Sequence, residues 1–352
     1  ITVNPDFSNV EVDDIFTNLT RFEVFLPEKR QFFIDNSDLF GSFGSSRDAI
    51  PFFSRRIGLA RDNAGNLIEN RIIGGVRLSG KLNEDWRLGL LNVQTDEDIN
   101  KSIASNNNMM LALQKMVFAR SNIGFFMINR QAFKDYDFLD SKNEYNRVLG
   151  VDYNLASSND VWIGKFYLHK SFQPDDTKGN LSSQATVTYN TRKFNYTTDF
   201  VYVDKDFRSD LGFIPRTGFY KSGNSATYNF YPKSGSINRH SIQALALFYW
   251  NPDLDFKKTD HEFRGTWDVE YKDRSSLEVQ YSNHYIFLTR DFDPTRSGGV
   301  PLLSNKTYSF NQLTSTYQSS LSKLFTYNAE TTVGQYYNGN VFATGGLLAY
   351  RV

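Results

Sequence analysis

A two-residue rhythm of apolar and charged side chains, kept up over segments of ten or more residues, constrains this chain more than any other feature. In residues 264–271 one set is Gly265, Trp267, Val269 and Tyr271, and the other is Arg264, Thr266, Asp268 and Glu270. Successive Cβ atoms of a β-strand point to opposite faces, so this pattern predicts a strand with one apolar and one ionic face. Similar alternation recurs in residues 160–169, 196–202, 277–287 and 325–333.

Strand-like segments follow one another from Arg71 to the C-terminus, separated by polar turns such as Asn338-Gly339-Asn340. We expect about 14 to 18 antiparallel strands, many of them about 10 to 14 residues long. At ~3.3 Å per residue and a tilt near 45°, a segment of about 10 residues spans roughly the 25 Å apolar band of an outer membrane. Aromatic clusters at segment ends, such as Phe248-Tyr249-Trp250, are typical of girdles at the lipid–water boundary. The sequence therefore predicts an all-β chain in which residues 71–352 form an antiparallel transmembrane β-barrel in the lipid of the bacterial outer membrane.

A large soluble β-structure, such as a propeller, is the alternative reading of the same alternation. The chain shows no repeat of blade length, and its ionic faces suit a dry core poorly because charged groups are rarely buried unpaired. A mean hydropathy of −0.48, with no apolar run near 18 residues, excludes a membrane helix. We therefore expect the ionic faces to line a lumen, with Arg264, Asp268, Glu270, Glu278 and Glu330 as lumen-lining residues.

Composition narrows the possible partners and chemistry. The 39 basic and 39 acidic residues balance, so no basic surplus points to a nucleic-acid partner. The absence of cysteine removes disulfides and thiolate chemistry. The four histidines are scattered singly, which predicts no metal site, and no motif predicts a cofactor. Asp253, Asp255 and Asp260 with Asn251 could hold Ca²⁺, but a solvated turn explains them better.

Residues 1–70 differ from the rest, because they are rich in Phe and charge and lack sustained alternation. Within them lies a dense charge cluster flanked by phenylalanines: Glu28, Lys29, Arg30, Arg55 and Arg56. One hypothesis is a plug, in which residues 20–60 pack inside the barrel or across its periplasmic mouth and the arginines meet carboxylates on the lumen face. The alternative is a solvated linker with incidental charges.

The C-terminal residues Leu347–Val352 resemble the interior of a strand, and an odd count of about fifteen strands cannot close an even-numbered antiparallel barrel. The expectation is that the full protein continues with more strands.

Several short motifs carry a resemblance: Asn4-Pro5-Asp6-Phe7-Ser8, Val10-Glu11-Val12-Asp13, Asn18-Leu19-Thr20-Arg21-Phe22-Glu23, residues 25–33, residues 52–58 and residues 206–216. Together they resemble a family of uncharacterised outer-membrane proteins, frequent in Bacteroidota. Members of that family carry an N-terminal domain similar to family 9 carbohydrate-binding modules ahead of a C-terminal barrel. This chain has no residues that match the module, so the resemblance implies a barrel and transfers neither a sugar site nor catalytic residues.

These expectations leave several classes of function open. The favoured class is a barrel that acts as a channel or transport protein, or as a scaffold that docks other outer-membrane or periplasmic proteins. Alternatives are a sugar-processing hydrolase that uses a carboxylate pair such as Asp268 and Glu270, or a protein that binds glycans through loops such as 291–306. Lumen lining explains the carboxylates equally well, so the residues do not favour an enzyme.

Overall fold

The computed structural model describes residues 1–5, 20–174 and 178–351. By its internal contacts the chain divides into two compact units. The first unit comprises residues 1–158, 164–185 and 201–219, and the second comprises residues 159–163, 186–200 and 220–352. Parts of the resemblance motifs, including Phe7, Ser8 and Val10–Asp13, lie outside the described residues.

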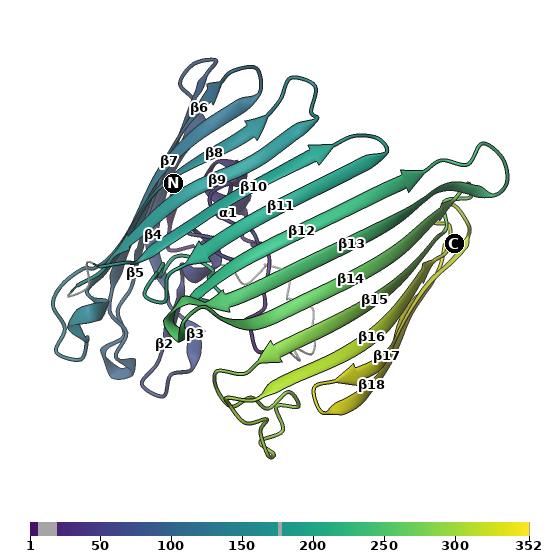
Figure 1. Cartoon of the computed structure of the whole chain (residues 1–352). Coiled ribbons are helices and arrows are strands. Elements are labelled where there is room, and N and C mark those ends of the chain that lie inside the picture. The colour runs from purple at the N-terminus through teal and green to yellow at the C-terminus, as the bar shows by residue number, and fades with distance from the viewer. Residues whose placement is uncertain (6–19, 175–177, 352) are drawn as a thin grey trace. The chain divides into compact units, whose positions relative to one another are not determined.

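Strands dominate the described part of the chain, where sixteen of them form one antiparallel sheet in the order β1, then β4 to β18 (Figure 1). Their bounds are β1 Thr2–Val3, β4 Ile72–Lys81, β5 Trp86–Thr95, β6 Asn106–Val117, β7 Ser121–Ala132, β8 Tyr145–Ala156, β9 Trp162–Phe172, β10 Leu181–Asn190, β11 Phe194–Val203, β12 Phe219–Phe230, β13 Ile237–Asn251, β14 Lys257–Tyr271, β15 Ser276–Phe287, β16 Thr307–Gln318, β17 Phe325–Tyr336 and β18 Gly339–Tyr350. A separate hairpin joins β2 (Leu59–Arg61) to β3 (Leu67–Glu69). The helices are short: α1 Gln31–Ile34, α2 Ser37–Gly41, and the 3₁₀ turns η1 Ser54–Arg56, η2 Ile99–Lys101, η3 Ser141–Asn143 and η4 Pro252–Leu254.

The expected all-β, antiparallel architecture is confirmed. From β4 onward each strand pairs with the strand that follows it in the sequence, as expected when short connections join antiparallel neighbours. The order of paired strands runs from β1 to β18 without returning to its start in the described residues, so a closed barrel stays a prediction.

In the first unit, burial falls on one face of the sheet. The inward-facing side chains of β5 to β8 are almost fully buried, among them Leu91, Met110, Phe126, Ile128 and Val148. Residues of the opposite parity, such as Leu78 on β4 and Leu168 on β9, are exposed although they are apolar. Other parts of the chain therefore cover one of the two faces, and in this unit residues 20–58 and the loop of residues 204–218 contribute to the cover.

In the second unit, the two faces differ in polarity. Arg264 and Asp268 of β14 share a face with Ser282 and Glu278 of β15, which lie directly opposite them in the register. Trp267 lies on the other face and is 45% exposed. A small apolar cluster, comprising Leu288, Leu302, Phe310 and Tyr337, closes the base of the loop that joins β15 to β16. None of the described helices is long and apolar enough to span a bilayer.

Candidate functional site

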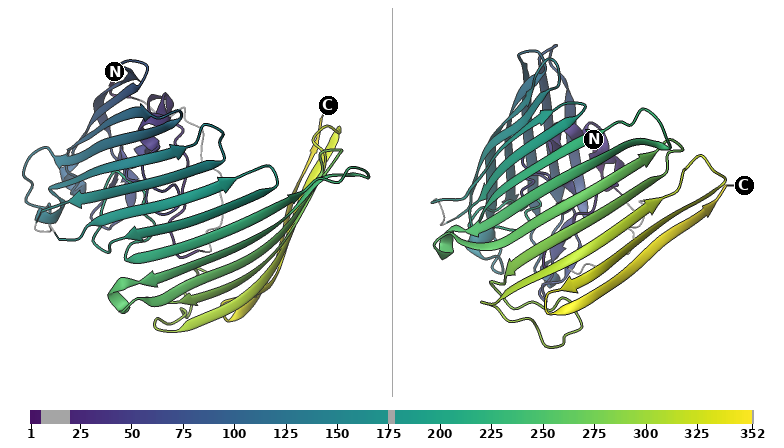
Figure 2. Two further views of the ribbon diagram at one scale, coloured as in Figure 1. Left: turned by 45° about the horizontal axis from the view of Figure 1, so that its top comes forward. Right: turned by 45° about the vertical axis from the view of Figure 1, so that its right-hand side comes forward.

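Residues 20–58, here named the covering segment, lie against the inward face of the first unit's sheet (Figures 1 and 2). Arg77 of β4 donates from Nη1 to the Phe32 carbonyl at 2.6 Å. Arg87 of β5 pairs with Asp38 of α2 at 2.8 Å. The segment is therefore held to the sheet by charge-assisted hydrogen bonds at successive strands.

Glycines in the sheet make room for aromatic rings of the covering segment. A Cβ atom built on Gly89 would lie 2.8 Å from Cζ of Phe40, and one built on Gly124 would lie 2.7 Å from Cε1 of Phe43. Phe43 also packs on Phe126 of β7, with ring centroids 4.7 Å apart. Because only glycine allows so close an approach, the sheet is shaped to these rings.

A buried carboxylate fixes the turn that follows α2. Asp152 of β8 accepts the Gly44 N–H at 2.8 Å, and its other oxygen lies 2.7 Å from Nε2 of His169 on β9. Nζ of Lys165 lies 3.5 Å from the same carboxylate and donates to the Ser42 carbonyl. Both Asp152 and His169 are almost fully buried, so this cluster is paired within the protein rather than by water.

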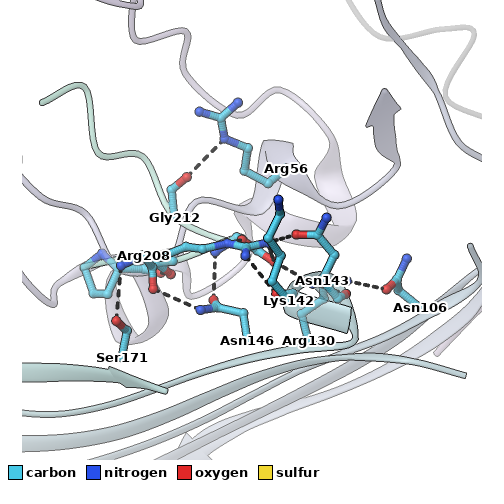
Figure 3. A network of polar contacts seen from close by, with 12 residues as sticks. Arg56, Asn106, Arg130, Lys142, Asn143, Asn146, Ser171, Arg208 and Gly212 are labelled. Carbon is cyan, nitrogen blue, oxygen red and sulfur yellow. Dashed lines mark hydrogen bonds and ion pairs between the residues drawn. The ribbon is translucent and has the colours of Figure 1, made fainter. Parts of the chain in front are cut away.

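A second polar network holds the loop of residues 204–218, between β11 and β12 (Figure 3). Asp210 forms an ion pair with Arg130 of β7 at 2.7 Å and accepts a hydrogen bond from Nε of Arg208 at 2.6 Å. Asn146 of β8 donates to the Arg208 carbonyl at 3.0 Å and accepts from the Asp210 N–H at 2.9 Å. The Asp210 carboxylate thus joins the loop to β7 through Arg130, and Asn146 joins the loop backbone to β8.

The loop of residues 204–218 also forms hydrogen bonds with the covering segment. Ile50 and Phe213 exchange backbone hydrogen bonds of 3.0 and 2.8 Å. Arg56 donates from Nε to the Gly212 carbonyl at 3.0 Å (Figure 3). The loop therefore acts as a bracket that holds residues 50–56 of the covering segment.

A family profile described as "Domain of unknown function (DUF5916)" matches residues 1–346. The chain belongs to the DUF5916 family. The match includes the covering segment, its bracket loop and nearly all of the strands, so the contacts described above lie within one DUF5916 domain. No curated protein and no solved structure matches the chain.

The charge cluster expected to reach lumen carboxylates makes most of its described contacts within the covering segment of this DUF5916 chain. Glu28 pairs with Arg30 at 2.8 Å, and Arg30 also donates to the Ile57 carbonyl at 2.7 Å. Arg55 donates to the Pro27 carbonyl, and Arg56 pairs with Glu23. Lys29 donates its backbone N–H to Glu28. Glu28 lies only two residues from Arg30, and its two carboxylate oxygens accept from Nε and Nη2 of the Arg30 guanidinium.

Glu28 is the electrostatic centre of that cluster. Burial alone would raise the pKa of its carboxyl group, but the hydrogen bonds and charge of Arg30, with the Ser54 hydroxyl, outweigh burial and lower the pKa. Glu28 is therefore held ionised where it ties residues 28–33 to residues 54–57.

The five predicted lumen-lining residues all lie in the second unit of the DUF5916 chain. Asp268 and Glu270 meet Arg239 of β13 at 2.9 and 3.5 Å, and Glu278 faces Asp268 across the β14–β15 register. Arg264 pairs with Glu262 on its own strand. Glu330 lies apart on β17, opposite Thr316. The structure thus brings two of the five to one arginine, with Glu278 beside one of them.

Metal binding gains no support from the described residues, because no group of three or more His, Asp or Glu side chains is placed to hold an ion. Asn251 accepts the Asp253 N–H at 2.8 Å and so caps η4.

Sequence reasoning missed Asp152, His169, Lys165 and Arg130 as a group. A signal existed for Arg130, a charged residue between the buried apolar side chains of Ile128 and Ala132 on the inward face of β7. Their partners in the covering segment, however, are more than 100 residues away in sequence for Asp152 and Lys165.

Proposed function

We propose that this DUF5916 chain is an integral protein of the bacterial outer membrane, that its strands cross the bilayer as a β-barrel, and that it is a transport protein in which the covering segment acts as a plug. The observation that carries the proposal is the exposed apolar face of the strands, which lies opposite a polar or covered face.

The apolar face continues from strand to strand in the second unit. Tyr281, Leu313, Val333 and Phe342 are direct neighbours in the registers of β15 to β18, and all four are exposed. Ile242 of β13 pairs with Trp267 of β14 on the same face, and it is 55% exposed. Soluble monomers rarely expose contiguous apolar patches beyond a few hundred Å². In lipid hydrocarbon, exposing such an apolar face carries no free-energy cost.

Basic and aromatic side chains meet near strand ends, as they do at a lipid–water boundary. The cation-to-ring distances are 5.2 Å for Lys115 over Trp86, 4.4 Å for Arg147 over Tyr145, 4.6 Å for Arg192 over Tyr231 and 4.6 Å for Lys258 over Tyr285. Long basic side chains and amphipathic rings prefer this depth, because their heads reach water while their stems stay apolar.

Strand length fits the same geometry. β6 has 12 residues. At ~3.4 Å per residue and a tilt near 45°, such a strand spans roughly 28 Å, against an apolar band of about 25 Å. The resemblance to outer-membrane proteins of Bacteroidota points in the same direction.

The proposal that the covering segment acts as a plug rests on the surface that this segment buries. Its rings on Gly89 and Gly124, and its turn on Asp152, remove the inward face of the first unit from water. A lumen blocked by a segment of its own chain is a known arrangement among large outer-membrane barrels. The transported solute would pass only when this segment moves.

Planar-bilayer conductance tests the proposal. The purified protein is reconstituted with and without residues 20–58, and heat-modifiable migration checks that each form is folded. We expect the intact protein to conduct little and the deletion to conduct strongly. Folded, inserted protein with equal conductance in both forms would exclude the plug and leave the scaffold role, whereas protein that stays dispersed in detergent-free buffer would exclude the membrane location.

A further inference from the structure

An aromatic pocket lies where β12, β13 and β14 meet the turn of residues 252–256. Tyr220, Trp250 and Phe256 line an open, shallow pocket of about 290 Å³. Tyr220 and Trp250 are direct register neighbours, and their ring centroids are 6.0 Å apart. These three side chains offer only two groups that could bind a polar ligand, the Tyr220 hydroxyl and the Trp250 indole N–H.

The turn that presents Phe256 is held in a costly conformation. Asp255 and Phe256 have φ angles of 51° and 54°, in the left-handed region that favours glycine. Phe256 is nevertheless a large side chain, and it is 63% exposed. Asn251 fixes the start of the turn by accepting the Asp253 N–H. The chain thus keeps an exposed ring at this position in spite of backbone strain, which points to a use for that ring.

Two consecutive lysines begin β14, directly after the turn of residues 252–256. Lys258 is the register partner of Trp250, and its Nζ lies 3.2 Å from Nδ1 of His261 and 4.6 Å from the centroid of Tyr285. Nε2 of His261 lies 3.0 Å from Oδ1 of Asn283, which makes Nε2 the donor and leaves Nδ1 to accept from Lys258. Lys257 lies 3.6 Å from the centroid of the Phe287 ring. In the described part of the chain neither lysine has a carboxylate within ion-pair distance.

From this juxtaposition we propose that the protein binds one anionic phospholipid here, with an acyl chain in the Tyr220–Trp250–Phe256 pocket and the lipid phosphate at Lys258 and Lys257. The proposal rests on the proposed membrane location, because Trp250 shares its face with the exposed apolar residues Phe263 and Ile242. Charge complementarity selects the headgroup, since two cations without acidic partners attract a phosphate. The apolar lining favours a lipid acyl chain over a sugar, because the hydroxyl groups of a sugar would need several polar partners.

Native mass spectrometry of the full chain in detergent tests the site, with phosphatidylglycerol and phosphatidylcholine as probes. Lys258→Gln should weaken phosphatidylglycerol binding by about fivefold and leave phosphatidylcholine binding unchanged, because each lysine near a membrane surface contributes a similar attraction. Lys257→Gln is a second variant with the same expectation. Trp250→Ala should weaken the binding of both lipids, since it removes a wall of the pocket. Lys272→Gln, in the exposed turn between β14 and β15, is the matched control.

Each outcome of this experiment supports or refutes the lipid site. Equal affinity of the wild type for the two lipids, or equal loss in Lys258→Gln and Lys272→Gln, would overturn the lipid site. Displacement of phosphatidylglycerol by inorganic phosphate at the same concentration would show a free-anion site instead. Heat-modifiable migration of every variant keeps this test separate from the proposed function: failure of the wild type to insert refutes the membrane location, whereas insertion without lipid preference refutes only the lipid site.

Discussion

Replacing Gly124 with alanine tests whether the covering segment is seated on the sheet by shape. The new Cβ would lie 2.7 Å from Cε1 of Phe43, a ring that is 4% exposed and already packed on Phe126. Overpacking of this kind costs about 1–3 kcal/mol. Lifting the segment off the sheet relieves the clash, so the cost falls on the closed state. At tenfold per ~1.4 kcal/mol, the population of the lifted state should rise by about 5- to 150-fold.

Thiol labelling measures that population directly. The chain has no cysteine, so Ser45→Cys in the covering segment, at a side chain that is 6% exposed, gives a single reporter of lifting. Gly80→Ala, where an added Cβ meets nothing within 4 Å, is the matched control. In the double variant of Gly124→Ala with Phe43→Leu, the smaller side chain should restore part of the protection. Equal labelling rates for Gly124→Ala and Gly80→Ala would refute the seating of Phe43 on Gly124.

Two further predictions concern the proposed lipid face and the charge cluster. Trp267→Arg should cost about 2–4 kcal/mol when the protein refolds from urea into vesicles, whereas Thr266→Arg on the opposite face is tolerated; equal costs would contradict the assignment of the faces. Because the pKa of Glu28 is lowered in the folded protein, its stabilising contribution is present above its unfolded pKa of about 4.3 and is lost as the pH falls through the folded value. The stability difference between wild type and Glu28→Gln, measured by urea unfolding, should therefore shrink between about pH 5 and pH 2, and a constant difference would contradict the role of Glu28.

Strand parity made much of the sheet predictable. In a strand the face of each side chain depends only on its position relative to its neighbours, so Trp267 and Asp268 could be assigned to opposite faces without any knowledge of their partners. The number of strands was also within reach, because connections are short enough for each segment to pair with the next.

Long-range contacts between the covering segment and the sheet could not be predicted from the sequence. A glycine inside a strand, such as Gly124, signals close approach by some group, but it does not say which one. Gly44 and Asp152 are 108 residues apart, and nothing local in either sequence names the other. For the arginines at positions 30 and 56 the hypothesis named distant carboxylates of the sheet, whereas the structure pairs them with carboxylates of the segment itself, Glu28 and Glu23.

The inward glycines also explain why the covering segment belongs to the folded state of the first unit. Glycine in a strand costs roughly 0.5–1 kcal/mol relative to alanine, so Gly89 and Gly124 weaken the bare sheet. That cost is offset only while Phe40 and Phe43 occupy the space, since each buried ring contributes about 1.5–3 kcal/mol. In the second unit, by contrast, the face that carries Arg264 and Asp268 keeps its charges paired along the strands. The first unit's inner surface is therefore built to be covered, and movement of the segment away from it must be driven by an interaction strong enough to replace those rings.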